Sequence, residues 1–433
     1  MLSRTDRILA ARDPRLTALP VLLDRVALQE WVSDVLGADL RVTPRYLRYK
    51  PGTSCVAAVE VTCPGTPTAT PLPPQLAALP ATPAGTRTVI VTAHGPDGVR
   101  KLGKTVERAP GGSVLATDQD LVAILTTVAA DRDLPAAAAL RDAARTERLV
   151  RRVAGDVVGG LDSGVGARQL AYKPQRRWVG TVRSDAGTDL LLRAYRPDDL
   201  AATSDRLRAL ERAGAATPRL LGRRTRSGLA VLEYRQGVAL EASAAAEDLA
   251  AVGSALGALH AAAANLPTRD PRTDLSAARR TARQVTVLLP HLRTRIDALT
   301  ATLSAGWSRA GAGTPVSLHG DFSLDQVIRA GDGAVTLIDL DHACLGPAEV
   351  DVASLAAQAV LDGAAEPQAL IAAVAAGYPG SLDATRLRLH VAAQLLRRAA
   401  EPFRGMRGDW AAATEAVLAR VEDLVRERLV VAS

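Results

Sequence analysis

Alternating apolar and polar positions predict two β-hairpins that lie far apart in the chain. Short apolar runs flank a turn over residues 45–61 and again over residues 169–182. The tripeptide Tyr-Lys-Pro stands at both turns, at 49–51 and at 172–174, and a further strand and a helix are expected after each hairpin. The pattern indicates a weak internal repeat, with two unrelated hairpins as the alternative.

A helical period replaces this alternation in the C-terminal half. Apolar positions recur every three to four residues over 249–263, 279–303, 352–361, 366–376, 383–400 and 410–430. The first 40 residues are also expected to be helical, with an apolar face that runs from Val26 to Leu36. Residues 121–125 are apolar and fit either a strand or a buried helix. Together these patterns predict an α+β protein.

Composition narrows the class of protein. The three cysteines are an odd number with scattered spacing, which favours neither a disulfide framework nor a metal site. This cysteine usage favours a reducing cytosol, so we expect a cytoplasmic protein. No apolar run reaches the ~18 residues of a membrane span, and no membrane partner is expected. The net charge of +7 comes from scattered arginines without aromatic platforms, so no nucleic-acid partner is expected. Only Lys50, Lys101, Lys104 and Lys173 are lysines.

The residues that carry candidate chemistry lie between Leu318 and Asp351. A turn, His319-Gly320-Asp321, is followed by Gln326 and by two short β-like runs, the second of which ends at Asp339. A hairpin of this kind can bring Asp321, Gln326 and Asp339 to one edge. Phosphoryl transfer needs a carboxylate that accepts the proton of the attacking hydroxyl and oxygen ligands that hold Mg²⁺. This spacing therefore indicates transfer from a nucleotide.

The same stretch resembles the aminoglycoside phosphotransferase and choline kinase-like superfamily. The resemblance implies a bilobal protein-kinase-like fold, ATP and Mg²⁺ as cofactors, Asp321 as general base, and Gln326 and Asp339 as metal ligands. His319 joins Asp321 in the candidate catalytic turn, where a structural hydrogen bond is its expected role. Asp351 is expected to brace this turn. Gln326 replaces the usual Asn, which resembles the maltokinase-like branch.

The resemblance extends to a small nucleotide-binding lobe. Its third strand would be residues 190–195, where Arg193 replaces the usual phosphate-binding Lys. The turn that carries Lys173 offers a second cation, and the backbone of Glu233 and Tyr234 would bind adenine. The implied organisation is an N-terminal α+β subdomain over 1–150, for which a degenerate repeat of the small lobe is one interpretation, followed by the small lobe over 151–237 and a helical catalytic lobe over 238–433.

The function implied is transfer of the γ-phosphate of ATP to a hydroxyl of a small molecule. A sugar, an aminocyclitol or an aminoglycoside is the expected acceptor. One alternative is a peptide Ser/Thr kinase in natural-product maturation. Another is a pseudokinase that binds nucleotide or a partner protein without turnover, an alternative that Arg193 favours and that the intact Asp321, Gln326 and Asp339 oppose.

Overall fold

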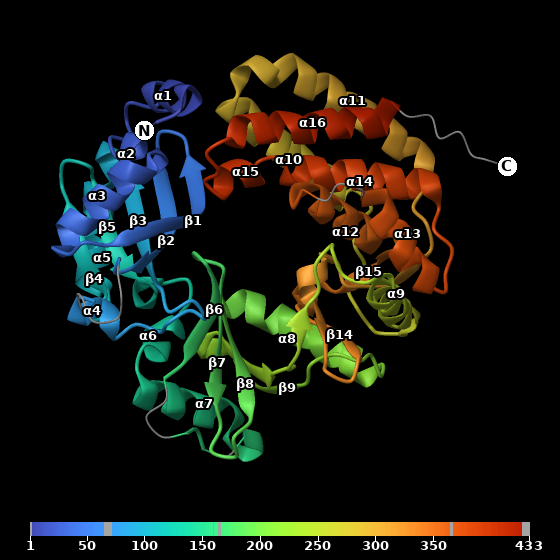
Figure 1. The fold of residues 1–433 in the computed structure, drawn as a ribbon, viewed down its shortest axis with the longest axis horizontal. Helices are drawn as coiled ribbons and strands as arrows, with labels where there is room; N and C mark the ends of the chain where they lie inside the picture. Colours follow the sequence, from blue (N-terminus) through green and yellow to red (C-terminus); the bar gives the residue numbers. More distant parts are fainter. Residues whose placement is uncertain (1, 65–71, 159, 163–165, 364–366, 427–433) are drawn as a thin grey trace. The chain divides into compact units, whose positions relative to one another are not determined.

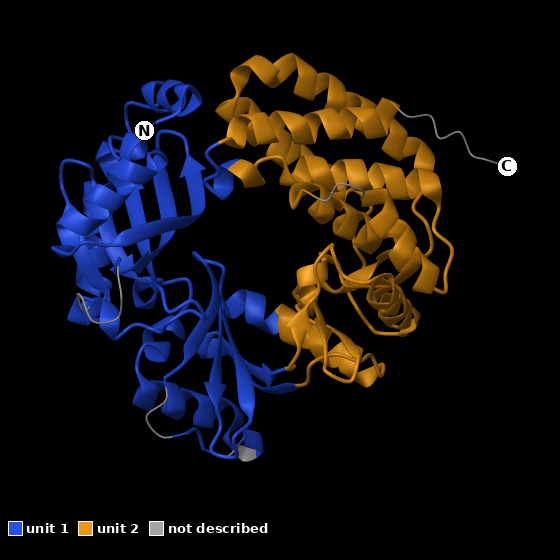
Figure 2. Cartoon of the chain, viewed as in Figure 1, with its two compact units in different colours: residues 1–201, 220–234, 403–408 blue, residues 202–219, 235–402, 409–433 orange. Residues whose placement is uncertain are grey.

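The computed structural model describes residues 2–64, 72–158, 160–162, 166–363 and 367–426. The chain divides into two compact units (Figure 2). The first unit contains residues 1–201, 220–234 and 403–408, and the second contains residues 202–219, 235–402 and 409–433. The first unit holds two β-sheets, and the second is mainly helical (Figure 1).

The first sheet is built from the N-terminal part of the chain. Its strands are antiparallel in the order β1 (Arg41–Lys50), β2 (Ser54–Thr62), β3 (Arg87–His94), β5 (Ala123–Thr127) and β4 (Val114–Asp118). The helices of this region are α1 (Arg4–Ala11), α2 (Leu19–Leu23), α3 (Arg25–Leu36), α4 (Pro74–Ala77) and α5 (Val99–Arg108). Asp24 caps α3, because its side chain accepts the Val26 N–H at 2.9 Å, and α3 packs against β1 and β4.

The second sheet repeats this strand order. It runs β6 (Arg168–Lys173), β7 (Arg177–Arg183), β8 (Asp189–Tyr195), β10 (Leu229–Glu233) and β9 (Leu220–Arg224), again antiparallel. The helices beside it in the chain are α6 (Ala137–Leu140), α7 (Ala143–Val158) and α8 (Pro197–Arg212). Helix α7 packs against β9 and β10, and Trp178 is buried in the core between them. Each sheet is therefore covered by the helix that precedes its first strand.

Both Tyr-Lys-Pro turns are closed by the same arrangement of hydrogen bonds. In the first, one carboxylate oxygen of Asp13 accepts the Tyr49 hydroxyl at 2.8 Å and the Gly52 N–H at 2.7 Å. The residue after proline has a left-handed backbone, with a φ of 64° at Gly52. The tyrosine and the turn are thus fixed by a single acid upstream of the hairpin.

The second turn repeats this arrangement with Asp131 as the acceptor. Its Oδ2 atom accepts the Tyr172 hydroxyl at 2.8 Å and the Gln175 N–H at 2.7 Å, and Gln175 has a φ of 60°. Burial raises the pKa of Tyr172 well above its ordinary value, and the nearby Asp131 charge acts in the same direction. The two copies thus share strand order, turn geometry and an acidic anchor.

The second unit is a helical assembly with two small sheets. Its long helices are α9 (Ala246–Ala261), α10 (Thr273–Leu288), α11 (Arg293–Ala310), α12 (Glu349–Leu361), α13 (Pro367–Gly377), α14 (Ala384–Arg398) and α16 (Trp410–Arg426). The short α15 (Glu401–Arg404) belongs partly to this unit and partly to the first. Helix α14 packs against α10, α12 and α16, while α13 packs on α9. One small sheet contains β11 (Val238–Ala239), β13 (Val327–Arg329) and β14 (Val335–Leu337). The other pairs β12 (Pro315–Leu318) with β15 (Cys344–Pro347).

The predicted α+β class is confirmed, and so are both predicted hairpins and the predicted helices of the C-terminal half, of which residues 366 and 427–430 lie outside the described residues. Residues 121–125, left open between strand and helix, contribute to strand β5. The predicted apolar face of the N-terminal helix is wrong at Val26, which is 54% exposed, because Leu28 and Val32 form the buried side of α3. Within the described residues no helix is long and apolar enough to cross a membrane.

Candidate active site

The turn His319-Gly320-Asp321 follows strand β12 and requires its glycine. Gly320 has a φ of 90°, in the region that residues with a side chain rarely adopt. A Cβ atom at Gly320 would lie 2.1 Å from the carbonyl oxygen of His342, a distance no carbon can occupy. The backbone of the turn is therefore packed directly against the segment that follows Asp339.

Asp351, in the first turn of α12, anchors this turn from behind. Its side chain is fully buried and accepts the N–H of His319 at 2.7 Å and the N–H of Gly320 at 2.8 Å. The Nε2 atom of His260 lies 3.1 Å from the same carboxylate. Burial opposes the charge of Asp351, but these donors outweigh burial and hold the pKa of Asp351 below its ordinary value. The predicted bracing role of Asp351 is confirmed.

His319 connects the turn to the hairpin of β13 and β14. The imidazole is fully buried, and its Nε2 donates to the carbonyl oxygen of Ile338 at 2.8 Å. The Ile338 N–H in turn donates to the carbonyl oxygen of Gln326 at 2.9 Å. The second of these bonds joins the backbone of Gln326 to that of Ile338. Asp339 follows Ile338 directly and has a left-handed backbone, with a φ of 64°. One chain of hydrogen bonds thus links the three segments that carry Asp321, Gln326 and Asp339.

Gln326 and Asp339, the predicted metal ligands, carry side-chain oxygens of the kind that Mg²⁺ prefers. The Oε1 atom of Gln326 accepts the Ser323 N–H at 3.1 Å, and an amide oxygen has a second lone pair for a metal. Mg²⁺ usually takes one or two protein oxygens and completes its shell with phosphate oxygens and water. The described residues contain no group of three or more His, Cys, Asp or Glu that could hold a metal ion.

Asp321 is held by two arginines that sequence reasoning did not identify. Its Oδ1 atom accepts from Arg397 at 2.6 Å and from Arg398 at 3.1 Å, and its side chain is 35% exposed. Burial alone would raise the pKa of Asp321, but the charges of Arg397 and Arg398 lower it to about 2. Asp321 is consequently a carboxylate at neutral pH, with Oδ1 bound to cations. The available signal was the pair of consecutive arginines at the end of the predicted helix 383–400.

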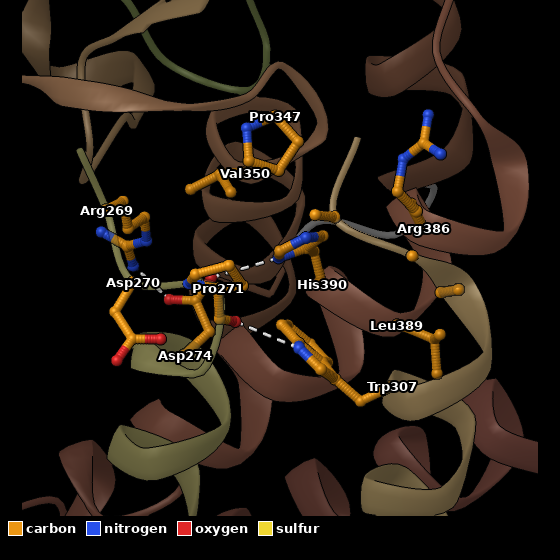
Figure 3. A pocket seen from close by; sticks show the side chains of 13 residues that line it. Arg269, Asp270, Pro271, Asp274, Trp307, Pro347, Val350, Arg386, Leu389 and His390 are labelled. Atoms are coloured by element: carbon orange, nitrogen blue, oxygen red, sulfur yellow. Dashed lines mark hydrogen bonds and ion pairs between the residues drawn. The ribbon is translucent and has the colours of Figure 1, made fainter. Parts of the chain in front are cut away.

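The two arginines belong to a buried polar network on helix α14. Gln394 accepts from Arg397 at 2.8 Å and donates to Asp274 at 3.3 Å, and Asp274 also lies 3.1 Å from Nδ1 of His390. Burial would raise the pKa of Asp274, but hydrogen bonding to His390 and the charge of Arg269 lower it to about 2. Figure 3 shows Arg269, Asp274 and His390 in a small pocket, where Trp307 donates to the carbonyl oxygen of Pro271 at 3.1 Å.

A larger cavity of about 370 Å³ opens beside Asp321 in the same unit. Four arginines line it together with three aspartates, namely Arg206, Arg269, Arg280, Arg397, Asp270, Asp274 and Asp321. Two of the three aspartates, Asp274 and Asp321, form ion pairs with arginine. The lining therefore presents more positive than negative charge to a molecule that would enter it.

The candidate nucleotide-binding residues lie on the second sheet of the other unit. Arg193 is buried on β8, with its guanidinium carbon 5.3 Å from the centre of the Tyr195 ring. Its neighbours Leu192 and Ala194 belong to the core under the opposite face, as predicted. The exposed Lys173 places its ammonium 5.9 Å from the centre of the Tyr46 ring. Glu233 ends strand β10, and Tyr234 follows it.

Comparisons with known proteins agree with this chemistry. A model described as the phosphotransferase enzyme family matches residues 169–390. That range includes the second sheet, the turn at Asp321, the hairpin with Gln326 and Asp339, and the bracing Asp351. No curated protein matches the chain.

Several solved structures are similar to part of the chain. A spectinomycin phosphotransferase, APH(9)-Ia, bound to ADP and spectinomycin, is 12% identical with a TM-score of 0.47, over 66% of this chain and 97% of its own. The choline kinase LicA from Streptococcus pneumoniae is 11% identical with a TM-score of 0.48, over 65% and 98%. The macrolide 2'-phosphotransferase MphH from Brachybacterium faecium is 19% identical with a TM-score of 0.43, over 65% and 97%. At these values neither an acceptor nor the role of any residue follows from the likeness.

Proposed function

The chain belongs to the phosphotransferase enzyme family, and from this premise we propose that it transfers the γ-phosphate of ATP to a hydroxyl group of a sugar. Membership of the family makes the protein a phosphotransferase with an alcohol group as acceptor and confirms the predicted superfamily. The maltokinase-like branch stays a prediction. The observation that carries the proposal is the hydrogen-bonded unit that ties the turn of Asp321 to Gln326 and Ile338.

Asp321 is the proposed general base. Arg397 and Arg398 both bind Oδ1, which leaves Oδ2 as the oxygen that would accept the hydrogen bond of the acceptor hydroxyl. A carboxylate with a pKa of about 2 is a weak base, so its main contribution is to orient the hydroxyl and receive its proton late in the transfer. His319 acts as a positioning residue in this proposal, because its imidazole is buried against Ile338.

Gln326 and Asp339 are the proposed protein ligands of Mg²⁺. When bound, the ion would neutralise charge on the phosphates of ATP. The backbone hydrogen bond from Ile338 to the carbonyl oxygen of Gln326 joins the two segments that carry these ligands. Arg193 is proposed to bind the phosphates, with Lys173 as a weaker candidate, and the backbone at Glu233 and Tyr234 is proposed to bind adenine.

The charge of the cavity beside Asp321 favours a sugar among the three expected acceptors. Aminocyclitols and aminoglycosides are cationic at neutral pH, and arginines such as Arg206 and Arg280 would repel them. A neutral or acidic sugar avoids this repulsion, and guanidinium groups donate hydrogen bonds to sugar oxygens. The volume of about 370 Å³ lies within the range of roughly 300–1,000 Å³ typical of small-molecule sites.

The test is transfer of radiolabelled phosphate from ATP to a panel of acceptors. The panel contains glucose, maltose, glucuronate, spectinomycin and kanamycin, and each is offered to the wild type, Asp321→Asn and Asp332→Asn. Asp332 is an exposed carboxylate at the tip of the β13–β14 hairpin and serves as the matched control. Label on a sugar in the wild type and in the control, but not in Asp321→Asn, is the expected result. Label on kanamycin or spectinomycin alone would refute the sugar assignment.

A further inference from the structure

A second cavity lies on the N-terminal sheet, within the first unit, and shares no lining residue with the cavity beside Asp321. Its volume is about 200 Å³. Strands β2, β3 and β5 form its floor, helix α5 forms one wall, and residues 130–133 with the 172–175 turn form another. All of these segments belong to the first unit, and none has a role in the proposed transfer apart from Lys173 in the turn.

The floor of this cavity is the same face of the sheet that carries Arg193 in the second copy. Thr92 on β3 pairs with Val56 and Ile124, and all three line the cavity. Arg193 on β8 pairs in the same way with one residue of β7 and one residue of β10. Arg193 therefore occupies the position in the second sheet that Thr92 occupies in the first. The first copy thus has a small hydroxyl where the second has a guanidinium, and the space above the strand stays open.

In the first copy, positively charged side chains line the cavity from helix α5 and not from the strand. Lys101 and Lys104 are three residues apart and so share one face of the helix, and both line the cavity. The chain has 53 Lys and Arg residues but only four lysines, two of which meet at this cavity. An ammonium is a compact point charge with three donors, which suits a tetrahedral anion approached from one side.

The two acids that line the cavity, Asp131 and Asp133, offset only part of its positive charge. Asp131 already accepts the Tyr172 hydroxyl, the Gln175 N–H and, at 3.1 Å, the Asp133 N–H. Within the described parts of the chain, neither Lys101 nor Lys104 forms an ion pair. Three basic side chains, Lys101, Lys104 and Arg132, thus line the cavity against the two carboxylates of Asp131 and Asp133, which leaves an excess of one positive charge.

The remaining lining can bind an uncharged, hydroxyl-bearing group. His94 is half-buried, and burial together with the charge of Lys101 lowers its pKa, so its imidazole is neutral at pH 7 and offers one donor and one acceptor. Thr126 adds a hydroxyl and Gln175 an amide, while Ile90 adds an apolar surface. The cavity is smaller than the roughly 300 Å³ at which sites for larger ligands begin, so a compact ligand is required.

We propose that this cavity binds a small phosphate monoester such as a sugar phosphate, with the phosphate on Lys101 and Lys104 and the ester group over Thr92 and Thr126. The ligand is bound and not chemically changed, because the described lining contains no equivalent of the Asp321 turn. The proposal does not depend on the acceptor or on the catalytic roles assigned above.

The experiment is calorimetric titration of the full-length protein with glucose 6-phosphate, with glucose and inorganic phosphate as separate probes. Lys101→Gln/Lys104→Gln removes the proposed phosphate contacts. Arg100→Gln/Arg108→Gln removes the same charge from exposed positions of α5 outside the cavity. We expect the lysine variant to bind glucose 6-phosphate at least about 10-fold more weakly, which corresponds to one lost charged hydrogen bond. The arginine variant is expected to match the wild type, and both variants should retain wild-type phosphotransfer rates.

Each contrary result would overturn a defined part of the proposal. Equal affinity in the lysine variant and the wild type, or no binding by the wild type at millimolar ligand, refutes the site. Inorganic phosphate that binds as tightly as glucose 6-phosphate refutes the ester contacts. Thr92→Leu fills the floor of the cavity without a change of charge. It is expected to weaken the binding of glucose 6-phosphate more than the binding of inorganic phosphate, and an equal effect on both ligands would also refute the ester contacts.

Discussion

Asp351→Asn tests whether the catalytic turn is held in place from α12. The substitution keeps the shape of the side chain but replaces one carboxylate oxygen by an NH₂ group. In the wild type, one oxygen accepts from Gly320, and the other accepts from His319 and lies beside His260. In either orientation of the asparagine, at least one of the two backbone N–H groups then faces a donor and loses its acceptor.

The magnitude follows from these three contacts. A buried donor left without an acceptor costs about 1–3 kcal/mol, and each remaining hydrogen bond loses about 1 kcal/mol when its acceptor is no longer charged. We therefore expect the free energy of unfolding to fall by about 2–4 kcal/mol. For a cooperative unit of this size class, that corresponds to a Tm lower by about 5–15 °C. Turnover is expected to fall as well, because Gly320 and Asp321 lose their fixed position.

Thermal and urea denaturation measure the first effect, and kcat at saturating ATP measures the second. Asp362→Asn is the matched control, since Asp362 follows the last turn of the same helix and forms one exposed hydrogen bond with Gln358. The control is expected to change stability by less than about 0.5 kcal/mol. A loss in Asp351→Asn no larger than that of the control would show that the turn does not depend on this carboxylate.

Four further predictions concern the site and its network. Asp321→Asn is expected to lower kcat by roughly 10²–10⁴-fold while a fluorescent ATP analogue still binds, and near-normal turnover would remove the base assignment. Asp339→Ala is expected to abolish the Mg²⁺ dependence of nucleotide binding in calorimetry, so an unchanged dependence would contradict the metal assignment. Arg193→Ala is expected to raise the KM for ATP more than Lys173→Ala does, and the reverse order in parallel titrations would assign the phosphates to the turn. Because the folded-state pKa of Asp274 is lowered to about 2, its ion pairs stabilise the fold above the ordinary pKa of 3.8 and lose this contribution as pH falls from about 4 to 2. Denaturation curves of Asp274→Asn should therefore be less sensitive to pH in that interval, and a parallel acid dependence would refute the link.

The parts of the site that could be predicted are those encoded by neighbouring residues. The turn at Asp321 and the hairpin that carries Gln326 and Asp339 follow from local apolar runs, a glycine and a short spacing. The pairing of Asp321 with Arg397 could not be predicted in this way. It joins residues 76 positions apart, and it depends on which face of α14 packs toward the turn.

The repeated hairpin also combines a local feature that could be predicted with a long-range contact that could not. The recurrence of Tyr-Lys-Pro was visible in the sequence, but the acid that closes each turn was not, because Asp13 and Asp131 stand at different distances before their tyrosines. A single Asp in a loop carries no signal of its long-range partner. Likewise, the rarity of lysine drew attention to Lys101 and Lys104, whereas the cavity that they share depends on how α5 lies over the sheet.

The position of Asp131 has a consequence for where this protein can be shortened. The family match begins at residue 169, and a truncation there would look natural from the sequence alone. Such a fragment would lack the acceptor of the Tyr172 hydroxyl and the Gln175 N–H, and also the residues from Leu134 to Ala154 that surround Trp178. A fragment that starts just before Asp131 keeps all of them. If the two parts of this chain are expressed separately, the boundary should therefore lie near residue 130, so that the second copy keeps Asp131.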